Sequence, residues 1–186
     1  MAGDLCLARR LSGPRSSPVV AQLTRSELTR CYSHAMKIFQ TLADIAALVG
    51  QEIVISDWIT ITQEQVNQFA QATGDHQWIH VDVEKAKAGP FGGPIAHGFL
   101  TLALIPKFFE SSLEIVERRM GVNYGLNKVR FMAPVLVGSR LRARLRLLKS
   151  ESIDNGGVQF CWEVTIECEG TSKPVCVAES LARLYP

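Results

Sequence analysis

The sequence lacks the features that mark several large classes of protein. Its longest apolar stretch, around Ile95–Ile105, contains His97 and falls far short of the roughly 20 residues that span a bilayer. The formal net charge of the 186 residues is only +2, which is too small to indicate a nucleic-acid partner. No G-x-S-x-G, G-x-G-x-x-G or P-loop pattern is present to favour a serine hydrolase or a nucleotide-binding enzyme. We therefore expect no membrane and no nucleic acid as partner.

Cysteine is scarce and shows no useful spacing. The five cysteines are Cys6, Cys31, Cys161, Cys168 and Cys176. An odd number without a C-x-x-C pair fits neither a disulfide framework nor a zinc ribbon. We expect reduced thiols and a cytoplasmic protein.

Residues 1–35 differ in composition from the rest of the chain. They are rich in Arg, Ser and Pro, contain few acids, and show no helical or strand period. They predict a disordered tail, a mitochondrial targeting segment, or an over-long start with true initiation at Met36. A tail or a false start is favoured, and a mitochondrial location follows only if the segment is a genuine transit peptide. Residues 36–186 are expected to form one domain.

The first half of this domain has helical signals. Thr41–Val49 predicts a short helix ended by Gly50, and Glu52–Thr60 predicts a strand. The capping box formed by Thr62 and Gln65 starts a second helix, which Gly74 ends before a strand begins near His80. A short helix is expected over Val83–Ala88. The stretch from His97 to Phe109 is apolar nearly all round and predicts a helix buried on most sides.

From Val122 onward the pattern changes to a period of two. Leu141, Ala143, Leu145 and Leu147 alternate with Arg140, Arg142, Arg144 and Arg146, which predicts a half-buried strand. The turn Asp154–Gly157 leads to strands over Phe160–Cys168 and Val175–Leu184. The arginine row is more often a solvated strand face, although it could also reach phosphates. A buried helix followed by strands predicts an α+β fold in which a curved antiparallel sheet wraps around the helix.

Asp75 and His80 stand five residues apart, just after the helix break at Gly74. Either could be a structural residue on its own, but a carboxylate and an imidazole together suit acid–base chemistry on a carbonyl compound. His76 and His80 also invite a zinc site, but Gln77 stands where a zinc protease needs Glu. Only His97 could serve as a third ligand. We therefore expect no metal.

The run Gly74-Asp75-His76-Gln77-Trp78-Ile79-His80 resembles the signature of the MaoC-like, (R)-specific enoyl-CoA hydratase ("hydratase 2") family. Pro94–Leu100 is similar to the start of that family's central helix, and Val129–Gly138 to its following strand and turn. The resemblance covers about residues 50–186 and is closest to the nodulation protein N-like subgroup. It implies the hotdog fold and a hydro-lyase acting on an acyl-CoA thioester without a cofactor.

The resemblance also implies roles for particular residues. Asp75 and His80 would hold and activate the water that adds to a trans-2-enoyl thioester. The backbone N–H at Gly98 would stabilise the enolate oxygen. Substrate-binding roles would fall to Gln77 and Trp78, which replace the family's Asn and Pro, and to His97 and Phe99 beside Gly98.

Two other functions stay open. Many hotdog thioesterases carry a carboxylate on the central helix, but Phe99–Phe109 contains none before Glu110, so this is the weaker enzyme alternative. The other alternative is a non-catalytic thioester-binding hotdog protein. Either way we expect a homodimer, because family members pair their sheets edge to edge and an unpaired edge is a liability.

Overall fold

The computed structural model describes residues 36–186, so every prediction made for residues 1–35 lies outside the described part. The strands are β1 (Lys37–Phe39), β2 (Glu52–Ile55), β3 (Ile59–Thr60), β4 (Leu113–Ile115), β5 (Met120–Phe131), β6 (Arg140–Ser152), β7 (Val158–Cys168) and β8 (Cys176–Tyr185). The helices are α2 (Leu42–Ala46), α3 (Gln63–Thr73), α4 (Trp78–Val81), α5 (Val83–Lys87), α6 (Gly98–Ala103) and α7 (Ile105–Glu110), with the 3₁₀ turn η1 (Asp154–Gly156).

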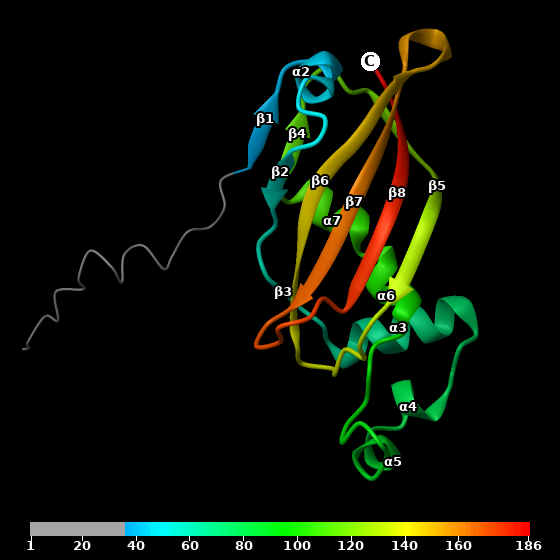
Figure 1. The fold of residues 1–186 in the computed structure, drawn as a ribbon. Helices are drawn as coiled ribbons and strands as arrows, with labels where there is room; N and C mark the ends of the chain where they lie inside the picture. The colour runs from blue at the N-terminus through cyan, green and yellow to red at the C-terminus, as the bar shows by residue number, and fades with distance from the viewer. Residues whose placement is uncertain (1–35) are drawn as a thin grey trace, which may run out of the picture. The chain divides into compact units, whose positions relative to one another are not determined.

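Six strands form one antiparallel sheet in the order β2-β6-β7-β8-β5, with β3 also paired to β6 (Figure 1). The apolar residues of β6 predicted from the alternation are fully buried, and Leu145 lies opposite Val164 of β7. The predicted hairpin turn also forms, with Asn155 in the left-handed region at φ 59°. The α+β prediction and the period-two strands are confirmed.

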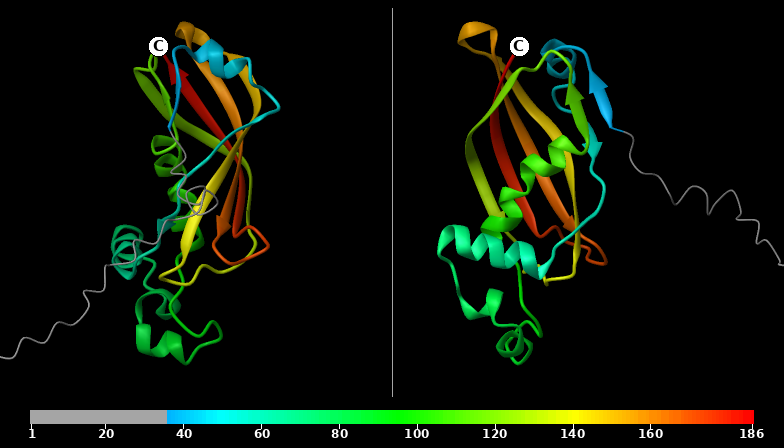
Figure 2. Two further views of the ribbon diagram at one scale, coloured as in Figure 1. Left: turned by 90° about the vertical axis from the view of Figure 1, so that its left-hand side faces the viewer. Right: turned by 180° about the vertical axis from the view of Figure 1, so that it is seen from behind.

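The central helix lies against one face of this sheet, as the view from behind shows (Figure 2). It is divided into α6 and α7 at Leu104, where one continuous helix was predicted. Pro106 explains the break, because it has no N–H to donate to the preceding turn. Leu100 and Phe108 are buried, whereas Phe99 is 68% exposed. The helix is thus buried on most sides, as predicted, and Phe99 lies on the side that the described chain leaves uncovered.

The predicted capping box of α3 forms: Thr62 Oγ1 accepts from the Gln65 N–H at 3.2 Å, and Gln65 Oε1 accepts from the Thr62 N–H at 2.9 Å. Gly74 ends the helix in the left-handed region at φ 79°. The strand predicted to start near His80 is wrong, because that residue lies in the helical turn α4. A strand needs a neighbouring strand to pair with, whereas this segment forms hydrogen bonds within itself. The His80 N–H donates to the Gln77 carbonyl, and the Asp82 N–H donates to the Trp78 carbonyl.

Two further local predictions need correction. The single strand expected over Glu52–Thr60 is interrupted between β2 and β3, where the Ser56 hydroxyl accepts from the Ala143 N–H at 2.8 Å. The helix expected over Thr41–Val49 ends earlier, at Ala46. The short parallel pair of β1 and β4 was not predicted, since three-residue strands carry too little periodicity.

No helix within residues 36–186 is long and apolar enough to cross a membrane.

Candidate active site

Three side chains from separate segments meet beside the start of α6. Asp75 follows the end of α3, His80 lies in α4, and His97 directly precedes α6. One ring nitrogen of each histidine and one carboxylate oxygen of Asp75 all lie within 4.8 Å of one another. The structure thus brings the predicted acid–base pair together and adds His97 to it.

The orientation of His80 leaves one ring nitrogen able to accept a proton. Its Nδ1 lies 2.7 Å from the carbonyl oxygen of Ile95, which can only accept a hydrogen bond, so Nδ1 carries the proton. The side-chain amide of Gln63 donates to the backbone oxygen of His80 at 2.8 Å and holds the turn from the other side. Nε2 of the neutral ring therefore has a free lone pair, as a general base requires.

Asp75 has a more open position. Its side chain is 54% exposed. Oδ1 accepts a long hydrogen bond of 3.4 Å from the Gln77 N–H, and Oδ2 lies 4.0 Å from Nε2 of His97. The half-exposed Asp75 carboxylate contacts bulk solvent, whereas the buried imidazole of His80 is reached only through the cavity that it lines. That arrangement suits a water molecule held at the boundary between them.

A cavity of about 280 Å³ opens next to this cluster. His80 and Gly98 form part of its wall, together with Thr101 of α6. The opposite wall is Phe131–Val135, at the end of β5 and in the segment that follows. Sequence reasoning noted Val129–Gly138 as part of the resemblance but missed its role as a wall. The only signal was the apolar composition of Phe131–Val135, which does not reveal what it faces.

Gly98 lies in this cavity wall, and its neighbour Phe131 gives a reason for a glycine at this position. A Cβ at Gly98 would lie 3.1 Å from the nearest carbon of the Phe131 ring. The space that a side chain would need is therefore occupied by Phe131. Glycine allows this ring to pack against the start of α6, close to the N–H groups of its first turn.

The structure places the other predicted substrate-binding residues outside the cavity wall. Gln77 is exposed and contacts Asp75 through its backbone N–H. Trp78 packs against Gly89 and lies under the ammonium group of Lys85, 4.9 Å from the ring centroid. Phe99 is exposed and contacts Phe131 edge to face at 5.6 Å between ring centroids. His97 is buried and does not line the cavity either.

The cluster has the composition of a metal site but not its geometry. The rings of His80 and His97 stack at 3.8 Å between centroids with an interplanar angle of 26°. The nitrogen lone pairs lie in the ring planes, so those of two nearly parallel stacked rings do not converge on one ion. In addition, Nε2 of His97 lies 2.9 Å from the Asp75 carbonyl oxygen and therefore carries a proton. These contacts favour the prediction of a site without metal.

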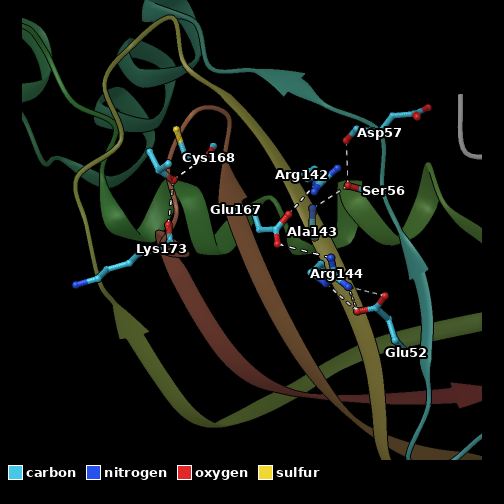
Figure 3. A network of polar contacts seen from close by, with 10 residues as sticks. Glu52, Ser56, Asp57, Arg142, Ala143, Arg144, Glu167, Cys168 and Lys173 are labelled. Carbon is cyan, nitrogen blue, oxygen red and sulfur yellow. Dashed lines mark hydrogen bonds and ion pairs between the residues drawn. The ribbon is translucent and has the colours of Figure 1, made fainter. Parts of the chain in front are cut away.

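The arginine row lies on the other face of the sheet from the core, and its charges are largely paired. The ion pairs are Arg142–Glu167 at 2.7 Å, Arg144–Glu52 at 2.8 Å and Arg140–Glu169 at 3.0 Å. Figure 3 shows the first two of these pairs beside Ser56 and Ala143. Because a carboxylate neutralises each of these guanidinium groups, this face is better explained as a solvated strand surface than as a phosphate site.

The fold and the site define a hotdog protein with an Asp–His pair at the start of its central helix. Residues 44–165 match the family described as MaoC like domain, so the chain belongs to that family. The structure is similar to the monoamine oxidase regulatory protein of "Archaeoglobus fulgius", with a TM-score of 0.64, 24% identity, and coverage of 80% of this chain and 95% of that one. The predicted family and the hotdog fold are confirmed.

Two curated relatives are more similar in sequence. The chain is 56% identical over 148 residues to 3-hydroxyacyl-thioester dehydratase Z of Mycobacterium tuberculosis, covering 80% of this chain and 98% of the relative. It is 46% identical to nodulation protein N of Rhizobium meliloti, covering 76% and 89%. The solved R-hydratase PhaJ1 of Pseudomonas aeruginosa matches with a TM-score of 0.57 and 26% identity, covering 74% of this chain and 81% of that one.

Proposed function

We propose that the protein is an (R)-specific enoyl-CoA hydratase, or 3-hydroxyacyl-CoA dehydratase in the reverse direction. The observation that carries the proposal is the 2.7 Å contact of His80 Nδ1 with the Ile95 carbonyl oxygen, which leaves Nε2 as the proton acceptor beside the Asp75 carboxylate, at the wall of an apolar cavity. A hydro-lyase of this kind needs one group to take a proton from water and one to return a proton to carbon. The names of the relatives, dehydratase Z and R-hydratase, support the same reaction class.

In the proposed reaction, Asp75 and His80 hold a water molecule between them. The water oxygen bonds to C3 of the trans-2-enoyl thioester while its proton passes to the pair. The electrons of the double bond move to the thioester oxygen as an enolate, and C2 then takes a proton from the pair. The product is a (R)-3-hydroxyacyl thioester, so atoms and charge balance without a cofactor.

The enolate oxygen needs a hydrogen-bond donor. We assign this role to the backbone N–H of Gly98, because Gly98 lines the cavity together with His80 and begins α6. The outer residues Gln77, Trp78 and Phe99 are proposed to contact the thioester where it leaves the cavity. A thioesterase remains the weaker candidate, since α6 and α7 present no carboxylate before Glu110.

The functional unit is proposed to be a homodimer formed through β5. This strand is paired only to β8, so its other edge is free within the described chain. Large apolar side chains are exposed along it and just beyond it: Met120, Val122, Tyr124, Leu126, Phe131 and Met132. Phe131 and Met132 also line the cavity, so a second copy at this edge would cover the outer side of the cavity wall.

Light scattering tests the dimer. The native chain should have twice the monomer mass at micromolar concentration, and Tyr124→Lys should shift it toward the monomer, because a charge would be buried at the interface. Ile38→Lys is the matched control, since Ile38 is 59% exposed on β1, away from this edge. A monomeric native chain, or an equal effect of both variants, would contradict the proposal.

The reaction is tested by steady-state assay with crotonyl-CoA and with a longer trans-2-enoyl-CoA, followed by chiral analysis of the product. Hydration to the (R)-alcohol is expected, and it should survive strong chelators, because the cluster lacks metal-binding geometry. Failure to hydrate any enoyl thioester would favour the binding role. Release of free CoA would favour the thioesterase.

A further inference from the structure

His97 is the most enclosed polar residue of the site. Its side chain is 2% exposed, and it does not line the cavity. One of its nitrogens, Nε2, lies 2.9 Å from the backbone oxygen of Asp75. Its ring stacks on the ring of His80 at 3.8 Å, and the ring of Phe69 contacts it at 5.0 Å. His97 is thus in contact with both members of the acid–base pair.

The hydrogen bonds of His97 fix its protonation pattern. A carbonyl oxygen accepts but does not donate, so Nε2 of His97 carries the proton that bonds Asp75. The other nitrogen, Nδ1, is buried and has no hydrogen-bond partner among residues 36–186. A buried acceptor without a partner costs free energy. A histidine at this position is therefore best explained by its Nε2–H and by its flat face.

We propose that His97 is a positioning residue that holds Asp75 and His80 in their relative places. This inference rests on the proposed function and replaces the substrate-binding role that the family resemblance implied for His97. The Nε2–H fixes the backbone at Asp75, just after Gly74 ends α3, and the ring face limits the tilt of the His80 imidazole. Because the ring does not reach the cavity, its effect on the reaction passes through these two neighbours.

Two substitutions separate these contacts. His97→Phe keeps a flat ring against His80 but removes the donor to Asp75. His97→Gln keeps an N–H donor near the Nε2 position but removes the ring. Each substitution is expected to lower kcat about tenfold, because the loss of one contact should raise the activation free energy by about 1.4 kcal/mol. KM should change less than about twofold, because no substrate contact is lost. His76→Gln, an exposed histidine outside the cluster, is the control and should leave both constants unchanged.

A measurement on the native chain tests the inference without substrate. In protein labelled with ¹⁵N-histidine, NMR should show the proton of His97 on Nε2 and that of His80 on Nδ1. A raised KM at unchanged kcat in the variants would show a substrate contact and overturn the inference. So would full activity of both variants, or a His97 proton on Nδ1. If the native chain hydrates no enoyl thioester, the proposed function fails, and the NMR result still decides whether His97 holds Asp75.

Discussion

Replacing His80 with asparagine is expected to lower kcat about 10²–10⁴-fold while leaving the local structure in place. The amide nitrogen of asparagine lies close to where Nδ1 of histidine does, so it can keep the 2.7 Å hydrogen bond to the Ile95 carbonyl. What it lacks is Nε2, the proposed proton acceptor. A positioned acid–base group contributes about 10²–10⁴ in rate, which corresponds to about 3–5 kcal/mol in the activation barrier.

His80→Ala should be equally inactive but less stable. It leaves the buried carbonyl of Ile95 without its partner, which costs about 1–3 kcal/mol of unfolding free energy in addition to lost packing. Asp75→Asn should match His80→Asn in kcat and melt like the native chain, because the Asp75 side chain is half exposed. Since the two groups act on one water, the double variant should be scarcely slower than either single variant.

The assay is loss of the enoyl-thioester absorbance with crotonyl-CoA, run beside thermal melting of each variant. His76→Gln is the control, because it removes an exposed imidazole next to Asp75 without touching the cluster. Full kcat in either His80→Asn or Asp75→Asn would refute the assigned chemistry. Strictly multiplicative effects in the double variant would refute the idea that the pair acts as a unit.

Three further outcomes are expected. Ser56→Ala should lower the unfolding free energy by about 1–3 kcal/mol in chemical denaturation, because the buried Ala143 N–H loses its acceptor, whereas exposed Ser172→Ala should change little. A chain starting at Met36 should keep the melting temperature and kcat of the full chain; a large fall in either would show that residues 1–35 are structural. Burial raises the pKa of the Cys176 thiol to about 11 from 9.0, so it should resist alkylation at pH 8. Stability should be lost between pH 9 and 11, where only the unfolded chain ionises this thiol, as denaturation at several pH values would show.

Features encoded over a few neighbouring residues were predictable from the sequence. The alternation in β6 identified a strand with one apolar face, since side chains of a strand point to opposite faces in turn. Thr62 and Gln65 marked the start of α3, because a capping box closes within four residues. The spacing of Asp75 and His80 after Gly74 was distinctive enough to indicate the family.

Features that depend on contacts between distant segments were decided only by the tertiary structure. His97 follows Asp75 by 22 residues, and nothing in the amino-acid sequence indicated that its ring would stack on the ring of His80. The cavity wall at Phe131–Val135 comes from the end of β5 and the segment that follows it, still further along the chain. Segments far apart meet only when the sheet closes around the helix, and apolar periodicity indicates that a residue is buried without indicating what it is buried against.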